Sequence, residues 1–283
     1  MKNILVIGSG RSAVTLIKYL LENSVKNDWK VTVADFSLDS ALDAVDNNVN
    51  GRAILFNVED ELQRSKEIKG SDIVISMLPA SLHVTVAKDC IKFKKNLVTA
   101  SYVSNEIAAL NDEAKNAGVL LLNEIGLDPG IDHMSAMKVI DDIKDEGGEI
   151  TSFKSYCGGL VHPDYDDNPW NYKFTWNPRN VVLAGQGTAQ YIESNSYKYI
   201  TYTKLFERTD IVSVLDAGEF EGYANRDSLS YRKSYGLHNI STLFRGTLRR
   251  RGYSEAWNIF VQLGVTDDSY KVENSDILTY RDF

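Results

Sequence analysis

The chain has 283 residues, of which 43% are hydrophobic and 25% charged, and its formal net charge is −8. This composition is typical of a globular protein with two modest domains. The negative charge argues against nucleic acid or a membrane surface as a partner, because both favour basic patches. With only Cys90 and Cys157 a disulfide framework is excluded, and we expect a cytoplasmic protein without a signal peptide or membrane span.

The first 35 residues predict a dinucleotide-binding unit. Residues 3–7 form an apolar run typical of a buried parallel strand, and the motif G-x-G-x-x-A follows at once over residues 8–13. A helical stripe of apolar residues comes next, and a second strand over residues 30–34 ends in Asp35. Strand, glycine turn, helix, strand and acid follow one another in the order that a dinucleotide site needs.

The glycines and the acid have separate expected roles in this site. Gly8 allows the tight turn, and Gly10 lets the backbone approach a pyrophosphate at the helix N-terminus. Asp35 is expected to accept both hydroxyls of the adenosine ribose. Since Asp35 would repel a 2′-phosphate and no basic residue follows in Asp35-Phe36-Ser37, we expect NAD rather than NADP. The alternative is a tight turn that binds nothing.

Alternating strands and helices continue along the first part of the chain. Further strands are predicted over residues 52–56, 72–77, 96–100 and 119–122, and we expect Ser104 to cap a helix that ends at Gly118. Six short strands separated by helices predict an α/β fold with a doubly wound parallel (Rossmann) sheet over residues 1–124. Ligands of such sheets bind at the carboxyl ends of the strands.

After Glu124 the pattern changes, and we expect a second, mixed α+β substrate-binding domain over residues 125–283. Asp128-Pro129 predicts the start of a helix that runs to about Glu146, with Asp128 as its N-cap. Alternatively, the carboxylate of Asp128 lies beside a bound nicotinamide. Residues 197–203 alternate and form the clearest predicted strand. The four histidines are scattered, so we expect no metal site.

Several runs of the sequence resemble the saccharopine reductase family, the glutamate-forming saccharopine dehydrogenases of lysine metabolism. The longest are residues 124–133, 155–160 and 167–176, and shorter ones are residues 99–104, 225–228 and 245–249. The resemblance implies an oxidoreductase that interconverts saccharopine with glutamate and 2-aminoadipate 6-semialdehyde by hydride transfer at a secondary amine. It also implies that family chains continue beyond Phe283, so that this chain is shorter than the family pattern at its C-terminus.

The resemblance also implies site residues, which we name by their positions in this sequence. It places the cofactor against Ser9, Gly10, Arg11, Ser12, Asp35, Phe36, Ser37, Asn57, Val58, Leu78, Pro79, Ser101, Leu127 and Pro129. It places the substrate against Ser101, Tyr102, Asp128, Arg226, Thr247, Leu248 and Arg249, with Cys157 near the reacting centre.

The chemistry of the implied substrate suits these residue types. Saccharopine is a secondary amine with three carboxylates, which arginines such as Arg226 and Arg249 can bind through paired hydrogen bonds. Oxidation gives an imine whose hydrolysis requires proton transfers, for which Asp128, Tyr102 and Cys157 are the candidates.

Two other functions stay open from the sequence. One is a related dehydrogenase of another amine–carbonyl adduct, of the carboxynorspermidine type, and the other is an inactive nucleotide-binding protein. In each case we expect small-molecule ligands, with a homodimer as the assembly to test.

Overall fold

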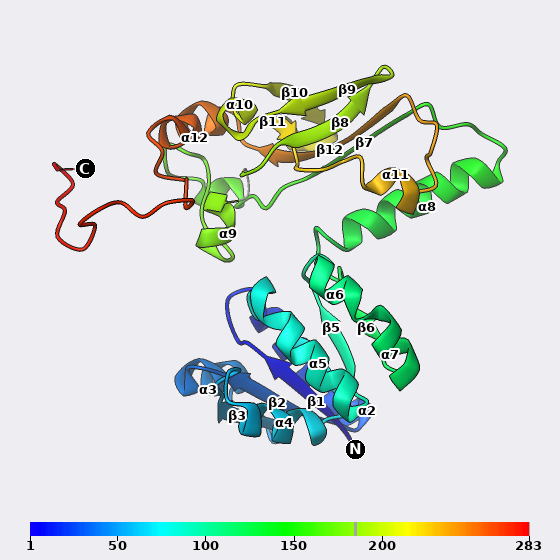
Figure 1. The fold of residues 1–283 in the computed structure, drawn as a ribbon, viewed down its shortest axis with the longest axis vertical. Coiled ribbons are helices and arrows are strands. Elements are labelled where there is room, and N and C mark those ends of the chain that lie inside the picture. Colours follow the sequence, from blue (N-terminus) through cyan, green and yellow to red (C-terminus); the bar gives the residue numbers. More distant parts are fainter. Residues whose placement is uncertain (184–185, 283) are drawn as a thin grey trace. The chain divides into compact units, whose positions relative to one another are not determined.

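The computed structural model describes residues 1–183 and 186–282. The chain forms two compact units, Met1–Ser135 and Ala136–Phe283 (Figure 1). The sequence-based boundary between residues 124 and 125 stays a prediction. None of the helices in the described ranges is both long and apolar enough to cross a membrane.

The first unit is built on a parallel six-stranded sheet with the order β3-β2-β1-β4-β5-β6. Its strands are β1 (Lys2–Ile7), β2 (Trp29–Asp35), β3 (Gly51–Leu55), β4 (Ile73–Ser76), β5 (Asn96–Thr99) and β6 (Leu121–Leu122). The strand order reverses between β1 and β4, which is the switch point where ligands of such sheets bind. The predicted doubly wound sheet is confirmed.

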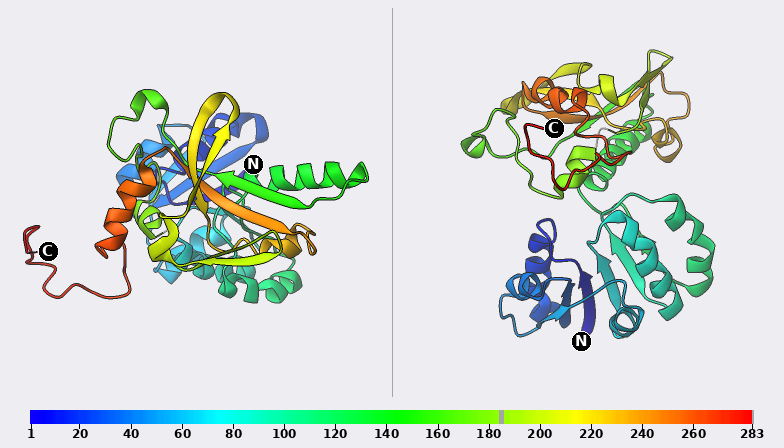
Figure 2. Two further views of the ribbon diagram at one scale, coloured as in Figure 1. Left: turned by 90° about the horizontal axis from the view of Figure 1, so that it is seen from above. Right: turned by 60° about the vertical axis from the view of Figure 1, so that its left-hand side comes forward.

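Helices cover both faces of this sheet, and each face has its own apolar core (Figure 1 and Figure 2). Helices α1 (Val14–Glu22) and α3 (Leu38–Val45) pack on one face, where Ile17 and Val33 are fully buried. Helices α4 (Glu61–Lys69), α5 (His83–Phe93) and α6 (Asn105–Ala109) pack on the other face. The remaining short elements are α2 (Ser24–Asn27), the 3-10 turn η1 (Ala80–Leu82) and α7 (Asn111–Ala117).

The predicted helix after Ser104 is confirmed, but it is divided in two. The Ser104 hydroxyl accepts a hydrogen bond from the Ile107 amide and caps α6. The helix is interrupted at Leu110. The second part, α7, ends at Ala117, and Gly118 caps it with φ at +68°. Glycine adopts this left-handed conformation at little cost.

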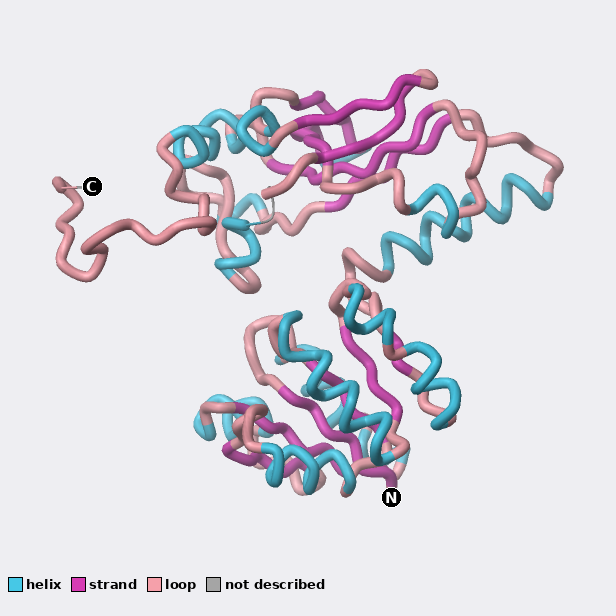
Figure 3. The backbone as a smooth tube through the Cα atoms, in the orientation of Figure 1, coloured by secondary structure: helices cyan, strands magenta, loops and turns pink. Residues whose placement is uncertain are grey.

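The second unit contains a mixed sheet and short helices, as predicted (Figure 3). Its strands are β7 (Ser152–Cys157), β8 (Ala189–Glu193), β9 (Ser196–Ile200), β10 (Thr209–Val214), β11 (Gly218–Ala224) and β12 (Thr242–Arg249). The order is β10-β11-β12-β8-β9, and β7 pairs in parallel with β12. Helix α8 (Ile131–Asp145) begins in the first unit and ends in the second. The other helices and 3-10 turns are η2 (Pro163–Tyr165), α9 (Pro178–Leu183), α10 (Tyr202–Leu205), η3 (Leu215–Ala217), α11 (Tyr231–Ser234) and α12 (Tyr253–Gln262).

Two local predictions in this part of the chain are wrong. The strand predicted over residues 197–203 ends at Ile200, because Tyr202 begins α10 and the chain turns to bury Leu205 and Phe206. The helix predicted from Asp128 begins only at Ile131, because the Ile131 and Asp132 amides bond to the carbonyls of Gly126 and Leu127.

The loop before α8 explains why Asp128 does not cap it. The Gly126 amide bonds to the Pro129 carbonyl at 2.8 Å, so residues 126–130 fold back on themselves. Gly130 has φ at +151°, and a Cβ there would lie 2.0 Å from the Gly126 carbonyl oxygen. The side chain of Asp132, rather than Asp128, accepts the bond from the Gly130 amide at 2.7 Å.

Candidate active site

The glycine-rich loop follows β1 at the carboxyl edge of the parallel sheet. Gly8 has φ at +100°, and a Cβ there would lie 3.0 Å from the Met77 carbonyl oxygen, at the end of β4. At Gly10 a Cβ would meet no described atom within 4 Å, so packing alone does not require glycine at this position. This open approach to the backbone fits a dinucleotide pyrophosphate.

Asp35 holds the glycine-rich loop from the end of β2. Its Oδ2 accepts hydrogen bonds from the Ser9 amide at 2.7 Å and the Ser9 hydroxyl at 2.9 Å. Its Oδ1 accepts one from the Ser37 amide at 2.9 Å, and the residue is only 8% exposed. Both carboxylate oxygens therefore have partners inside the protein, whereas Phe36 is 86% exposed.

The loop after β3 is held by α4. The Asn57 amide donates to Gln63 Oε1 at 2.9 Å, and Arg64 donates to the Val58 carbonyl. Arg64 is fixed in turn by a buried ion pair, with 2.7 Å between its Nε and Oδ2 of Asp89 on α5. The predicted cofactor residues thus lie at the end of β2 (Asp35) or in the loops that follow the strands of this sheet: Gly8, Ser9, Gly10, Arg11, Ser12, Phe36, Ser37, Asn57, Val58, Leu78, Pro79, Ser101, Leu127 and Pro129.

Two of the three predicted catalytic residues contact each other at the same edge. The Tyr102 hydroxyl, after β5, donates to Asp128 Oδ1 at 2.8 Å. The loops that carry them are tied together, since the Glu124 amide donates to the Ser101 carbonyl and Glu124 Oε1 accepts from the Val103 amide. Tyr102 is 38% exposed, so a ligand can reach this pair.

Near Ser101 lies a buried histidine that the sequence did not single out. His83 begins α5, is 2% exposed and contacts the hydroxyls of Ser76, Thr99 and Ser101. Burial lowers the pKa of His83 to about 4, so the ring is neutral near pH 7. The only sequence signal was its position shortly after the fourth strand.

The second unit carries the third predicted catalytic residue and four of the predicted substrate residues: Arg226, Thr247, Leu248 and Arg249. Cys157 of β7 pairs in register with Thr247 of β12, and Thr247 with Tyr223 of β11. Registered neighbours share a face of a sheet, and Arg249 follows two residues after Thr247. Cys157, Thr247 and Arg249 therefore lie on one face, and Leu248 points to the other.

Arg249 is a buried cation surrounded by tyrosines. It is 5% exposed, and its guanidinium carbon lies 4.7 Å from the ring centre of Tyr172, 5.2 Å from that of Tyr253 and 6.0 Å from that of Tyr223. Burial favours loss of its proton, but the tyrosines hold the pKa of Arg249 above its usual value. Its Nη1 donates to the Leu248 carbonyl, whereas its buried Nε has no hydrogen-bond partner among the described residues.

This surrounding favours an anionic ligand, because a counter-charge stabilises a buried cation and a ligand oxygen could bond the unsatisfied Nε. The sequence did not predict the three tyrosines, which come from distant parts of the chain. Arg226 follows β11, is exposed, and its carbonyl accepts from the Gln190 amide at 2.8 Å. Its role as a substrate anchor stays a prediction.

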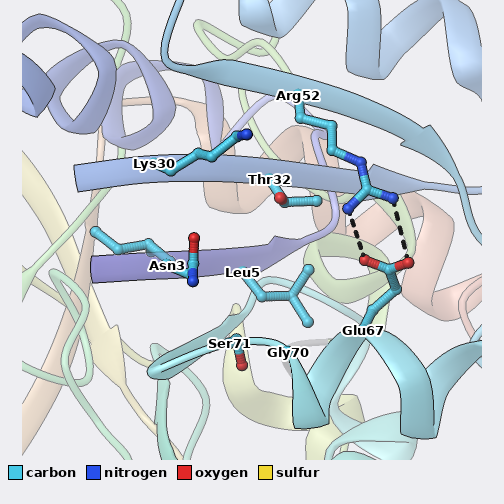
Figure 4. Close-up of a pocket in the computed structure, with 9 residues that line it drawn as sticks. Asn3, Leu5, Lys30, Thr32, Arg52, Glu67, Gly70 and Ser71 are labelled. Atoms are coloured by element: carbon cyan, nitrogen blue, oxygen red, sulfur yellow. Dashed lines mark hydrogen bonds and ion pairs between the residues drawn. The ribbon is translucent and has the colours of Figure 1, made fainter. Parts of the chain in front are cut away.

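A surface pocket of about 160 Å³ lies elsewhere on the first unit (Figure 4). It is lined by Asn3, Lys30 and Arg52 near the amino ends of their strands, and Arg52 pairs with Glu67 at 3.1 Å. Dinucleotides bind at the carboxyl ends of such sheets. The pocket is therefore separate from the candidate site, and among the described residues no cluster fits a metal ion.

The chain is similar to known proteins along most of its length. Residues 4–122 match the family described as "Saccharopine dehydrogenase NADP binding domain", and residues 126–280 match "Saccharopine dehydrogenase C-terminal domain". The chain is 38% identical over 269 residues to a saccharopine dehydrogenase [NADP(+), L-glutamate-forming] of Schizosaccharomyces pombe, covering 95% of this chain and 59% of that protein. It is 42% identical over 249 residues to an alpha-aminoadipic semialdehyde synthase of Arabidopsis thaliana, covering 87% of this chain and 23% of that protein.

A solved structure is also similar. The apo saccharopine dehydrogenase (L-Glu forming) of Saccharomyces cerevisiae superposes with a TM-score of 0.86 at 36% identity, covering 96% of this chain and 60% of that one. The chain therefore spans less than two thirds of the length of these relatives.

These findings correct the predicted cofactor. The matched domain and the fungal relatives are named for NADP, so the expected preference for NAD is wrong. The structure gives a physical reason: the carboxylate of Asp35, on which the prediction depended, accepts hydrogen bonds from Ser9 and Ser37, so its oxygens already have partners within the protein. Matching both domain models and sharing the fold of the yeast enzyme, the chain belongs to the saccharopine dehydrogenase family.

Proposed function

We propose that this protein is an NADP-dependent, L-glutamate-forming saccharopine dehydrogenase. The observation that carries the proposal is the hydrogen bond from Tyr102 to Asp128. It joins a proton donor and a carboxylate at the sheet edge where dinucleotides of this fold present their nicotinamide. The names of the fungal relatives support the same activity.

The overall reaction converts saccharopine, NADP⁺ and water into glutamate, 2-aminoadipate 6-semialdehyde, NADPH and a proton. When bound, NADP⁺ would accept the hydride from the carbon beside the secondary amine. Asp128 can pair with the substrate ammonium or take its proton, and the Tyr102 hydroxyl can hold or pass on a proton at Asp128 Oδ1. Cys157 is the third candidate for proton transfer, on the same face as Thr247.

Arg249 is the strongest candidate for binding a substrate carboxylate. Tyrosine rings surround its guanidinium, and its buried Nε is a donor that a carboxylate could use. Leu248 can contribute only its backbone to that face. Homodimer formation and a cytoplasmic location stay predictions.

Formation of NADPH from NADP⁺ and saccharopine tests the proposed activity, with NAD⁺ measured in parallel. Arg249→Met keeps the length of the side chain but removes the charge, and should weaken saccharopine binding by about 2–4 kcal/mol. Arg251→Met is the control, since Arg251 is exposed and pairs with Glu219. If the folded protein neither binds saccharopine in calorimetry nor reduces NADP⁺ with it, the proposal is wrong.

A further inference from the structure

His83 links two strands of the parallel sheet through hydroxyl groups. Its Nδ1 lies 2.9 Å from the Ser76 hydroxyl at the end of β4. Its Nε2 lies 2.7 Å from the Ser101 hydroxyl and 3.2 Å from that of Thr99, at the end of β5. The ring is buried, so these hydroxyls rather than water occupy its two nitrogens.

The neutral ring has one donor and one acceptor, and each nitrogen has a hydroxyl to bond. Thr99 also fixes the backbone of Ser101, because the Thr99 hydroxyl accepts a hydrogen bond from the Ser101 amide at 3.3 Å. Ser101 is therefore fixed at its backbone and at its side chain. A hydroxyl without such partners would sample several rotamers.

We propose that His83 is a positioning residue that fixes the Ser101 hydroxyl where cofactor and substrate would meet. This inference rests on the proposed function. Ser101 precedes Tyr102, the donor to Asp128, and its carbonyl accepts from the Glu124 amide at 3.1 Å. The position of Ser101 therefore affects the positions of the two loops that carry Tyr102 and Asp128. Because the ring nitrogens contact only uncharged hydroxyls among the described residues, His83 acts through geometry rather than through charge.

Two amide substitutions separate this role from simple packing. In His83→Gln the amide reaches the place of Nε2 and can still bond Ser101, whereas in His83→Asn it reaches only the place of Nδ1 and Ser76. We expect His83→Gln to keep kcat for saccharopine oxidation and NADPH affinity within about threefold of the parent. His83→Asn should lower kcat about tenfold or more with a smaller change in the KM for saccharopine, at a similar melting temperature. His238→Asn, at an exposed histidine, is the matched control.

Ser101→Ala provides a second test that leaves the buried ring in place. It should reproduce the loss seen in His83→Asn, and the double variant should lose little more, because both changes remove one contact. If Ser101→Ala keeps the parent kcat and NADPH affinity, or if folded His83→Asn and His83→Gln behave alike, His83 only fills space and the inference is wrong.

NADPH affinity keeps the inference separate from the proposed function. If the parent protein does not oxidise saccharopine, the proposed function fails. In that case NADPH affinity, measured by quenching of tryptophan fluorescence, decides on His83: His83→Gln should bind NADPH like the parent, and His83→Asn and Ser101→Ala should bind it more weakly. Equal affinities across the variants would then overturn the inference.

Discussion

The local sequence around Asp128 suggests a helix cap, but in the structure this side chain makes a different contact. As an N-cap it would bond the first amides of a helix, but α8 begins at Ile131, and Asp132 accepts from the Gly130 amide just before the helix. Instead, Asp128 accepts from the Tyr102 hydroxyl. Asp128 therefore bonds a side chain of the loop after β5 rather than the helix that follows it.

Replacing Asp128 by asparagine should separate stability from activity. The asparagine oxygen can still accept from Tyr102, so the free energy of unfolding should change by less than about 1 kcal/mol. Because an amide can neither pair with an ammonium nor take a proton, kcat/KM for saccharopine should fall about tenfold or more. Asp112→Asn, on exposed α7, is the control. Full activity in Asp128→Asn would remove Asp128 from the mechanism.

His83 should make folding depend on pH below neutrality. Burial lowers its pKa to about 4 in the folded protein, against 6.5 for an ordinary histidine. Between these values the unfolded chain binds more protons than the folded one, so the free energy of unfolding falls as the pH falls from about 6.5 to about 4. The loss from this residue is at most about 3 kcal/mol.

Urea unfolding at a series of pH values measures this dependence. His83→Gln cannot titrate, so its free energy of unfolding should fall less steeply than that of the parent over this range. Identical slopes in the two proteins would show that His83 is accessible to protons in the folded state.

At the level of the elements, Asp35 connects the end of β2 to the glycine-rich loop. Asp35→Ala removes three hydrogen bonds from this contact and should weaken NADPH and NADH binding by similar factors, on the order of tenfold. Both affinities should fall alike because the variant loses the bonds that hold the glycine-rich loop, which both cofactors use, rather than a contact to the ribose. Asp39→Ala, on the exposed first turn of α3, is the control. A change in the ratio of the two affinities of more than about tenfold would mean that Asp35 faces the ribose after all.

Helices α4 and α5 are joined by the buried pair of Arg64 and Asp89, with side chains only 8% and 10% exposed. Removing one partner leaves a buried charge unpaired, so Arg64→Met or Asp89→Asn should each cost about 3 kcal/mol of unfolding free energy. The double variant should cost less than the sum of the two single losses. The exposed pair of Lys138 and Asp142 is the control, and the corresponding cycle there should give less than about 1 kcal/mol. If the two double-mutant cycles gave equal coupling free energies, burial would not be what strengthens the pair of Arg64 and Asp89.

At the scale of the whole molecule, the first unit has a complete core on each face of its sheet. We therefore expect residues 1–135, expressed alone, to fold and to bind NADPH within about threefold of the full chain. The same fragment with Gly8→Ala is the control, since the added Cβ would meet the Met77 carbonyl. A folded fragment without NADPH affinity would show that the first unit lacks part of the cofactor site.

The sequence by itself determined the parallel sheet, its helices and the glycine-rich loop. These features depend on neighbours in the chain: apolar runs, capping residues such as Ser104, and glycines such as Gly8 that allow conformations closed to other residues. Long matching runs likewise indicated the saccharopine dehydrogenase family, because motifs keep their local order.

The tertiary structure alone decided which side chains meet. Asp35 bonds Ser9, which lies 26 residues away in the sequence, and Tyr102 bonds Asp128 across the same separation. His83 joins the ends of two strands, and three distant tyrosines surround Arg249. Local patterns determine where an element lies, but the partners of its side chains depend on the packing of the whole sheet. For this reason the class of the protein was evident from the sequence, whereas the bonds of Asp35 to the glycine-rich loop were not.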